Sequence, residues 1–435
     1  MDEVPFRLES GQAWDLADRF GTPLYVLDEA TIRSRARAYR ESFKSAAPGS
    51  ILSYASKANS TLAVIEILHQ EGFTIDVASE GELEAALRAG VPAAECHLHG
   101  NAKSNALLDR ALEEGIGKIV VDSLTEAQRL ADRKSKFKNT KLLLRLNPSV
   151  QPETHEKIST GHEDTKFGLS ILEGSAEQAL KLMIRAGLPI VGLHGHVGSQ
   201  LLDPEAQVDA AIRMAEFGTA MAEKIGFAFQ ILNLGGGLGV AYAGDPQPLS
   251  IAEYCRQLVG AVRARVPDSI QLQQEPGRSL VADAGVTIYR VETIKEVSGV
   301  PFVSVDGGLS DNPRPALYGA NYRTDWFRAS NYAYVTDGPG AVSFDLDGVR
   351  TAEVYGAHCE VDHLFSNVEM PVAAAEGDLL VALSTGAYNA SMASNYNRFA
   401  RPATVLLRPD GPVLVQDREN WDTIFARERR IGPTG

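Results

Sequence analysis

Cysteine is scarce in this chain of 435 residues, and the positions of the cysteines exclude two common roles. Cys96, Cys255 and Cys359 are the only three, and they lie far apart in the sequence. Because no Cys-x-x-Cys pair occurs, neither a disulfide framework nor a cysteine zinc site is expected. Unpaired cysteines fit a reducing compartment, so we expect a cytoplasmic protein.

Long apolar runs and an excess of positive charge are also absent. No apolar run approaches the roughly 18 residues of a membrane-spanning helix, and the stretch MDEVPFRLES lacks the apolar core of a secretory signal. The formal net charge of −14 argues against a nucleic-acid or anionic-membrane partner. Hydrophobic residues make up 44% and charged residues 23%, an ordinary globular composition that can bury a sizeable core.

A regular alternation of strand-like and helix-like segments begins near residue 51. The strand-like segments are residues 51–55, 74–78, 96–100, 118–122, 141–147, 190–198, 230–236 and 270–276. Helical spacing of apolar residues separates them, for example at 60–72, 80–90, 104–115 and 205–226. Eight strands with seven helices between them, over about 230 residues, predict a (β/α)8 barrel of the TIM type. An open doubly wound sheet is the alternative, and the count of eight favours the barrel.

The helical spacing disappears from about residue 284. The later strand-like segments are residues 286–297, 301–308, 333–338, 350–360, 378–385 and 403–416, separated by Gly, Pro, Asp and Asn. We therefore expect two domains. One is an α/β barrel over residues 33–283, and the other is a mostly β sandwich or barrel built from residues 1–32 together with 284–435.

Chemically distinctive residues stand where the predicted barrel strands end, which is where such barrels assemble their functional sites. They are Lys57, Asp76, Ser79, Arg145, His194, His196, Ser199, Gly235, Gly236, Gly237, Glu275, Gly277 and Arg278. Lys57 either marks the point where a strand reaches water or is an amine held in a pocket for chemistry. His194 and His196, two positions apart, would share one face of a strand and make a metal conceivable. No third ligand stands out, so no metal is expected.

Several of these groups together suit one cofactor. The glycines at 235–237 form a tight turn or let the backbone bind an anion, and their spacing favours a single phosphate over a pyrophosphate. Glu275 and Arg278 are either a structural ion pair or the groups for a protonated ring nitrogen and an oxyanion. His196 is either a core histidine or a ring-stacking one. With the amine of Lys57, the functional interpretations describe a pyridoxal phosphate pocket.

Longer motifs make the chain similar to a known family. They are YASKAN, DVASEGEL, HGHVGSQ, NLGGGLG, EPGRSLVA, DNPRPALYGA and GAYNASMASNYN, and they run nearly from end to end. On these motifs the chain resembles the fold-type III pyridoxal-phosphate decarboxylases of the ornithine, diaminopimelate and arginine group, and among them the diaminopimelate decarboxylases. The resemblance implies pyridoxal 5′-phosphate as cofactor. It also implies decarboxylation of meso-2,6-diaminopimelate to L-lysine and CO2, the last step of lysine biosynthesis.

The resemblance further implies roles for single residues. Lys57 corresponds to the Schiff-base lysine, His196 to the ring-stacking histidine and Glu275 to the carboxylate on the ring nitrogen. The other cofactor contacts would be Asp76, Ser199, Gly235, Gly236, Gly237, Gly277, Arg278 and Tyr388. The substrate contacts would be Arg278, Arg314, Tyr318, Glu360 and Tyr388. Cys359 corresponds to the residue that protonates the substrate carbon, and it would enter the partner's site with Glu360 in a homodimer.

One segment departs from the family pattern. The family reads Cys-Glu-Ser-x-Asp, whereas this chain reads Cys359-Glu360-Val361-Asp362-His363. Val361 cannot donate the hydrogen bond of a serine, and His363 replaces an acid. The sequence therefore leaves open how the substrate's far amine is recognised, and with it the choice of substrate. The alternatives are a related decarboxylase for another diamino acid or carboxylated polyamine, and a catalytically inactive regulatory homologue. Retention of the cofactor residues argues against the second.

Overall fold

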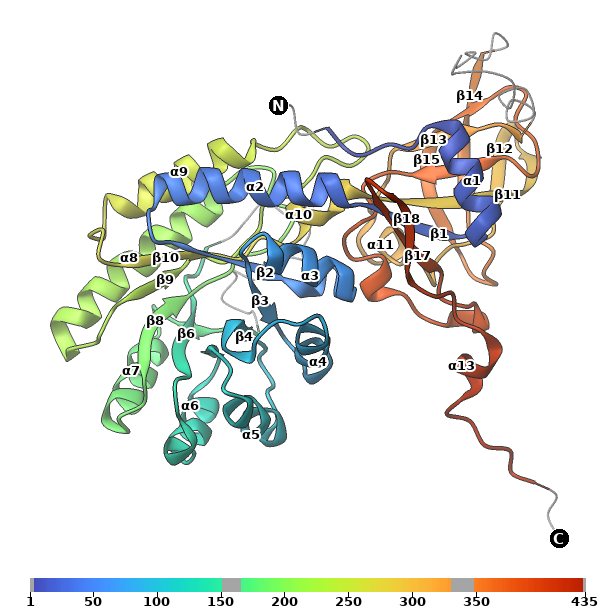
Figure 1. Cartoon of the computed structure of the whole chain (residues 1–435). Coiled ribbons are helices and arrows are strands. Elements are labelled where there is room, and N and C mark those ends of the chain that lie inside the picture. The colour runs from blue at the N-terminus through green and yellow to red at the C-terminus, as the bar shows by residue number, and fades with distance from the viewer. Residues whose placement is uncertain (1–3, 151–165, 330–347, 433–435) are drawn as a thin grey trace. The chain divides into compact units, whose positions relative to one another are not determined.

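The computed structural model describes residues 4–150, 166–329 and 348–432, and the strand expected at 333–338 lies outside them. The chain divides into two compact units (Figure 1). The first, which we name the barrel unit, consists of Ile32–Ala241 and Pro246–Val281. The second, the β unit, consists of Met1–Thr31, Tyr242–Asp245 and Ala282–Gly435.

Parallel strands form a closed ring in the barrel unit. In chain order they are β2 (Ile51–Ala55), β3 (Thr74–Val77), β4 (Cys96–Leu98), β5 (Lys118–Val121), β6 (Lys141–Asn147), β8 (Ile190–His194), β9 (Ile231–Asn233) and β10 (Gln271–Gln274). β10 pairs with β2, and β5 pairs with β6, which closes the ring. The short β7 (Leu169–Ser170) pairs with β6 beside the ring. The predicted (β/α)8 barrel is confirmed, and each predicted barrel strand contains an observed one.

Helices alternate with these strands around the barrel (Figure 1). They are α2 (Glu29–Ala46), α3 (Leu62–Gln70), α4 (Glu80–Arg88), α5 (Asn105–Glu114), α6 (Leu124–Ala131), α7 (Ser175–Arg185), α8 (Glu205–Ile225), α9 (Ile251–Arg263) and the short α10 (Arg278–Val281). Ser79, Ser104, Ser123 and Ser250 cap α4, α5, α6 and α9 by accepting a backbone N–H of the first turn. Ser79 is thus a helix cap. No helix in the described ranges is long and apolar enough to cross a membrane.

The β unit is built on a twisted sheet with few helices. Its strands are β1 (Leu24–Asp28), β11 (Gly285–Val297), β12 (Val300–Val305), β13 (Thr324–Phe327), β14 (Val349–Tyr355), β15 (His363–Pro371), β16 (Leu379–Ala382), β17 (Ala403–Arg408) and β18 (Gly411–Gln416). The main order is β15-β14-β12-β11-β1-β17-β18, and β16 pairs with β11 and β13. The helices are α1 (Ser10–Phe20), α11 (Arg314–Tyr318) and α13 (Trp421–Phe425). The expectation of a mostly β second fold is confirmed.

The N-terminal strand lies inside this sheet. β1 pairs antiparallel with β11 and parallel with β17, so segments from both ends of the chain are neighbours. Trp14 of α1 packs with Leu24, Val286, Val381 and Val405 in one apolar core. This core explains why the first residues of the chain fold with the last ones.

Candidate active site

Lys57 follows the first barrel strand, as predicted, but its side chain is exposed. It lies in the turn Ser56–Ala58, whose other two residues are buried. The Ser56 hydroxyl donates to the carbonyl oxygen of Asp76 at 2.7 Å, and a Cβ on Gly277 would lie 3.3 Å from that of Ala58. The strand therefore reaches solvent at Lys57 while the turn buries its two neighbours, and the role of the amine in a pocket stays a prediction.

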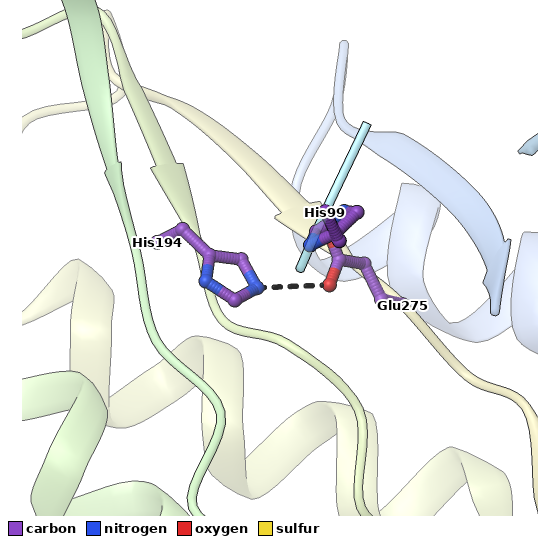
Figure 2. Close-up of side chains that lie close together, drawn as sticks. All are labelled: His99, His194 and Glu275. Atoms are coloured by element: carbon purple, nitrogen blue, oxygen red, sulfur yellow. Dashed lines mark hydrogen bonds and ion pairs between the residues drawn. The ribbon is translucent and has the colours of Figure 1, made fainter. Parts of the chain in front are cut away.

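The carboxylate of Glu275 stands at the centre of a cluster supplied by several strand ends (Figure 2). Nε2 of His194, the last residue of β8, lies 3.0 Å from Oε2 of Glu275. Nε2 of His99, which follows β4, lies 3.3 Å from Oε1. The amide of Asn233, at the end of β9, also donates to Oε1. Four strand ends of the barrel therefore converge on one buried carboxylate.

The charges in this cluster decide which groups are ionised. Burial lowers the pKa of His99, but the negative charges of Glu275 and Asp76 outweigh burial and raise this pKa to about 9. Burial lowers the pKa of His194 to about 4. Burial acts to raise the pKa of Glu275, yet His99 and His194 hold it well below its usual value. At neutral pH the cluster is an ionised Glu275 between a cationic His99 and a neutral His194.

Asp76 connects this cluster to polar side chains farther along the barrel interior. Its Oδ1 lies 3.5 Å from Nε2 of His99 and 3.3 Å from Nδ1 of His97. Nε2 of His97 lies 2.9 Å from Nζ of Lys118, a buried amine whose pKa burial lowers to about 8. The predicted site residue Asp76 therefore lies beside the Glu275 cluster, with histidines as its neighbours.

His196, Ser199 and Arg278 make two contacts around the glycine turn. Nδ1 of His196 lies 3.1 Å from the carbonyl oxygen of Gly236, and Nη2 of Arg278 donates to the Ser199 hydroxyl at 3.1 Å. Burial lowers the pKa of His196 well below its usual value, and the charge of Lys57 lowers it further. The ring of His196 is therefore neutral at neutral pH.

The glycine turn is required by the packing of the chain itself. A Cβ on Gly235 would lie 2.4 Å from the carbonyl oxygen of Gly195, and one on Gly236 would lie 2.1 Å from that of Glu275. Gly235 also has a φ of 66°, which residues with a Cβ rarely adopt. A tight turn pressed between two strand ends accounts for these glycines, and a phosphate seat on the backbone of 235–237 stays a prediction.

The guanidinium of Arg314 is buried among tyrosines of the β unit. Nη1 donates to the hydroxyls of Tyr242 at 2.8 Å and Tyr322 at 2.7 Å, and the ring centroid of Tyr318 lies 5.9 Å from Cζ. Arg314 is 3% exposed, and no acidic side chain in the described ranges pairs with it. A buried cation with only neutral partners carries a desolvation cost, so this position suits an anion from a ligand.

The remaining predicted residues of the β unit lie on two segments. Tyr388 is half-buried and has a left-handed φ of 61°. Cys359 and Glu360 are exposed on the turn between β14 and β15. The N–H of Cys359 donates to Oδ1 of Asn397 at 3.0 Å, and the Tyr396 hydroxyl donates to Oε2 of Glu360 at 3.3 Å.

Among the described residues, the group that could hold a metal ion differs from the histidine pair considered in the sequence. His194 and His196 do not act as a pair, because His196 lies beyond the end of β8 and contacts the glycine turn. Instead, the ligand atoms of His99, His194 and Glu275 lie within 4.8 Å of one another. Two histidines and a carboxylate are a set that zinc accepts. Hydrogen bonding and ion pairing among the three already account for their approach.

Sequence reasoning missed His99, Asn233, Tyr242 and Tyr322. The rule that barrel strand ends carry the site would have found the first two, since Asn233 ends β9 and His99 follows β4 by one residue. No sequence signal marks the two tyrosines, because buried tyrosines are common and their approach to Arg314 depends on the fold.

The residues of the barrel unit fit a pyridoxal phosphate group. Several buried atoms here make no hydrogen bond of good geometry with the described residues, namely both carboxylate oxygens of Asp76, Nε2 of His99 and Nδ1 of His194. Buried polar atoms that have ion-pair neighbours but incomplete hydrogen bonding are what a polar ligand engages. The ionised Glu275 suits a protonated ring nitrogen, and Arg278 suits phosphate oxygens.

Comparison with known proteins places this barrel in a class. Residues 29–282 match the family model described as pyridoxal-dependent decarboxylase, pyridoxal binding domain. The match covers the barrel unit and the strand ends that carry the Glu275 cluster. The fold, the site and this match therefore assign the chain to the class of the pyridoxal-dependent decarboxylases.

Relatives that match nearly the whole chain narrow this class to one family of decarboxylases. The diaminopimelate decarboxylase of Bacillus subtilis is 40% identical over 94% of this chain and 92% of its own length, and that of Staphylococcus aureus is 38% identical over 90% of each. The structure of diaminopimelate decarboxylase from M. jannaschii with L-lysine has a TM-score of 0.86 at 31% identity, covering 99% of this chain and 97% of its own. The chain belongs to the diaminopimelate decarboxylase family.

A second kind of solved neighbour is more distant. The lysine/ornithine decarboxylase of Vibrio vulnificus, solved with putrescine, has a TM-score of 0.77 at 26% identity. That alignment covers 92% of this chain and 99% of the neighbour. The solved neighbours of this chain therefore include decarboxylases named for substrates with one carboxylate as well as for a substrate with two.

Proposed function

We propose that this protein decarboxylates meso-2,6-diaminopimelate to L-lysine and CO2 with pyridoxal 5′-phosphate as cofactor. Relatives named diaminopimelate decarboxylase match it over more than nine tenths of its length, at about 40% identity. The donor set at the barrel strand ends fits the cofactor. Both observations support the same reaction class, a carboxy-lyase reaction.

Each group at the barrel strand ends has one task in this proposal. Lys57, whose amine is exposed and reachable, would hold the cofactor covalently and exchange it with the substrate amine. Glu275 would keep the ring nitrogen protonated, and the neutral imidazole of His196 would lie against the ring face. Bound pyridoxal phosphate supplies an electron sink for the pair that the departing CO2 leaves on the substrate carbon.

The observation that carries the choice of substrate is the buried guanidinium of Arg314. Meso-diaminopimelate has two α-amino acid centres, so one carboxylate remains when the other is placed for decarboxylation. A guanidinium binds a carboxylate through two parallel hydrogen bonds, and burial among tyrosines keeps competing water away. Lysine and ornithine lack the second carboxylate and would leave Arg314 without an anion.

The proposal includes a homodimer in which Cys359 and Glu360 of the partner subunit complete each site. Both side chains are exposed on one turn, where they can serve another chain. Glu360 would bind the far ammonium of the substrate, and Cys359 would deliver a proton to the substrate carbon. An exposed thiol stays free in a reducing compartment, which supports a cytoplasmic location.

A panel of amino acids with detection of CO2 and product tests the substrate. The kcat/KM for meso-diaminopimelate should exceed the values for lysine, ornithine and arginine by at least about 100-fold, because only the former has the second carboxylate. If any of those three is the better substrate, the assignment is wrong.

Cofactor attachment has its own test. Lys57→Ala should lack the visible absorption of the covalently bound cofactor, whereas Lys141→Ala, which alters an exposed lysine at the start of β6, should keep it. Absence of this absorption from the cofactor-loaded wild type would contradict the proposed role of Lys57.

A further inference from the structure

The turn that carries Cys359 and Glu360 is closed from within by a buried carboxylate. This turn, residues 356–362, joins β14 to β15. Oδ2 of Asp362 accepts the backbone N–H of His358 at 3.1 Å and lies 2.5 Å from Nδ1 of the same residue. Oδ1 of Asp362 accepts the backbone N–H of Leu309 at 2.7 Å. One side chain therefore joins both ends of the turn to the segment that follows β12.

The backbone repeats the same connections. The N–H of Gly356 donates to the carbonyl oxygen of Asp362 at 2.7 Å, and the N–H of Ala357 donates to that of Gly307 at 2.8 Å. The His358 ring is fully buried and packs on the ring of Phe399, with centroids 4.3 Å apart. The base of the turn is thus fixed by hydrogen bonds and by packing.

The carboxylate of Asp362 fills the space beside two glycines. A Cβ on Gly308 would lie 2.1 Å from Oδ2 of Asp362, and a Cβ on Gly356 would lie 2.0 Å from it. Gly308 also has a φ of 153°, so a substitution there is strained on two counts. Because these two residues are glycines, the carboxylate of Asp362 can lie between them. The local sequence therefore matches a turn that is closed by this carboxylate.

The tip above this base is open to solvent. Cys359, Glu360 and Val361 are exposed, with 82% of Val361 accessible. Among the described residues, two side chains outside the tip hydrogen-bond to it: Asn397 accepts the N–H of Cys359, and the Tyr396 hydroxyl donates to Glu360. The position of the tip therefore depends mainly on the base. By contrast, His363 faces away from the base and pairs with Glu353 of β14 at 2.7 Å.

We propose that Asp362 is a positioning residue that holds Cys359 and Glu360 in the geometry needed for the reaction. The inference rests on the proposed function, because it takes the roles of these two residues from there. It also accounts for the departure from the family pattern, since the acid expected at 363 stands one residue earlier and anchors the turn. The substrate-facing pair Cys359 and Glu360 is then kept in place without the serine and acid of the pattern.

A double-mutant cycle on the holoenzyme tests the proposal. In the wild-type background Asp362→Ala should lower kcat by about 30-fold, because small misplacement of a reacting group has large effects on rate. In the Cys359→Ala background the same change should lower the residual kcat by less than about 3-fold, since the proton-delivering group is already gone and misplacement of Glu360 weakens substrate binding, which is read in KM. An equal fall in both backgrounds would show a general structural role and overturn the proposal.

Hydrogen exchange provides a readout that needs no substrate. In Asp362→Ala the amides of 307–309 and 356–361 should exchange at least about 10-fold faster than in wild type, whereas those of β11 should not change. Unchanged exchange at 356–361 would overturn the anchor. If the wild type releases CO2 from no amino acid, the proposed function fails, and the exchange result still decides whether Asp362 holds the turn.

Two variants keep the test interpretable. Glu353→Gln is the matched control, because Glu353 also pairs with a histidine and accepts a backbone N–H, at 3.2 Å from Asn367, but within the described ranges it forms no hydrogen bond with the turn 356–362. It should leave kcat and the exchange of 356–361 within about twofold of wild type. If Asp362→Ala does not fold, Asp362→Asn, which keeps the volume, should show the same coupling to Cys359 with a smaller fall in kcat.

Discussion

At the scale of single residues, buried charges show where the chain relies on a ligand. Arg314 makes hydrogen bonds only to tyrosine hydroxyls, and its Nε has no partner among the described residues. A cation in such a place is held at an energetic disadvantage until an anion arrives. The proposed binding of a substrate carboxylate accounts for this buried cation better than a contribution to stability does.

Arg314→Met should therefore separate activity from stability. We expect kcat/KM for meso-diaminopimelate to fall at least about 100-fold, while the free energy of unfolding changes by less than about 1 kcal/mol or increases, because a desolvated charge is removed. Steady-state kinetics and urea unfolding measure the two effects. Arg350→Met, at an exposed arginine of β14, should change neither. A loss of several kcal/mol in Arg314→Met would identify a structural cation instead.

His99 links the stability of the cofactor-free protein to pH. Its pKa is about 9 in the folded chain, against an ordinary value near 6.5. The folded state therefore binds a proton more tightly than the unfolded state, and the stabilisation is complete below about pH 6.5 and lost as the pH rises to about 9. The largest possible contribution is about 3 kcal/mol.

The measurement is urea unfolding of cofactor-free wild type and His99→Gln between about pH 6 and 9. We expect wild type to lose stability relative to the variant as the pH rises through this window. His69→Gln, at a surface histidine that pairs with Glu95, is the control and should follow wild type. Parallel curves for wild type and His99→Gln would contradict the shifted pKa.

At the scale of secondary-structure elements, a buried ion pair joins two helix starts of the barrel. Nζ of Lys103, just before α5, lies 2.7 Å from Oε1 of Glu126 in the first turn of α6. The same amine donates to the carbonyl oxygens of Gly100 at 2.6 Å and Val120 at 2.7 Å. Both side chains are at most 5% exposed, so each depends on the other.

Lys103→Met should destabilise the protein by about 3–5 kcal/mol, because it leaves the buried carboxylate of Glu126 without its cation, although the backbone N–H of Asp122 still donates to it. The double variant Lys103→Met with Glu126→Gln should regain part of this loss. Guanidinium unfolding measures the difference, and Lys138→Met, at an exposed lysine before β6, serves as the control. Equal losses in the single and double variants would argue against the pairing.

Elements with one strong pattern could be predicted from the sequence, and those that depend on partners could not. The barrel strands were found because they are short apolar runs between helices with clear spacing. β13 and β15 were missed, since Thr324–Phe327 is only half-buried and His363–Pro371 mixes buried and exposed positions across register shifts. Their strand character comes from pairing with β16 and β14.

The candidate active site shows the same division between residues with a local sequence pattern and contacts that depend on the fold. Lys57, Glu275 and Arg314 carried a sequence signal in the motifs around them. The surroundings of these residues did not, because His99, Asn233 and the tyrosines arrive from segments far away in the chain. The sequence left two interpretations of Lys57 open, and its exposure depends on the turn after the strand, which the apolar run before it does not reveal.

At the scale of the whole molecule, the proposed dimer predicts complementation between inactive chains. Lys57→Ala and Cys359→Ala alter different sites of one active centre if each centre uses both subunits. Mixed with verified subunit exchange, the two variants should recover up to about a quarter of wild-type activity, since half the dimers are hybrids and each hybrid has one intact site. A mixture of Lys57→Ala with Glu275→Gln is the control and should recover none. No recovery in the first mixture would contradict shared sites.

The place of β1 inside the β sheet has a consequence for how the chain is made. β1 pairs with β11 and β17. It has no partner strand until residues 285–297 are synthesised, and its second partner follows with residues 403–408. At about 5–20 residues per second, the 256 residues between Asp28 and Gly285 take about 13–50 s to synthesise. During that interval the barrel segment can fold, while the apolar strand LYVLD has both edges unpaired. In the nascent chain, the unpaired apolar strand LYVLD is therefore the segment that most requires protection by a chaperone.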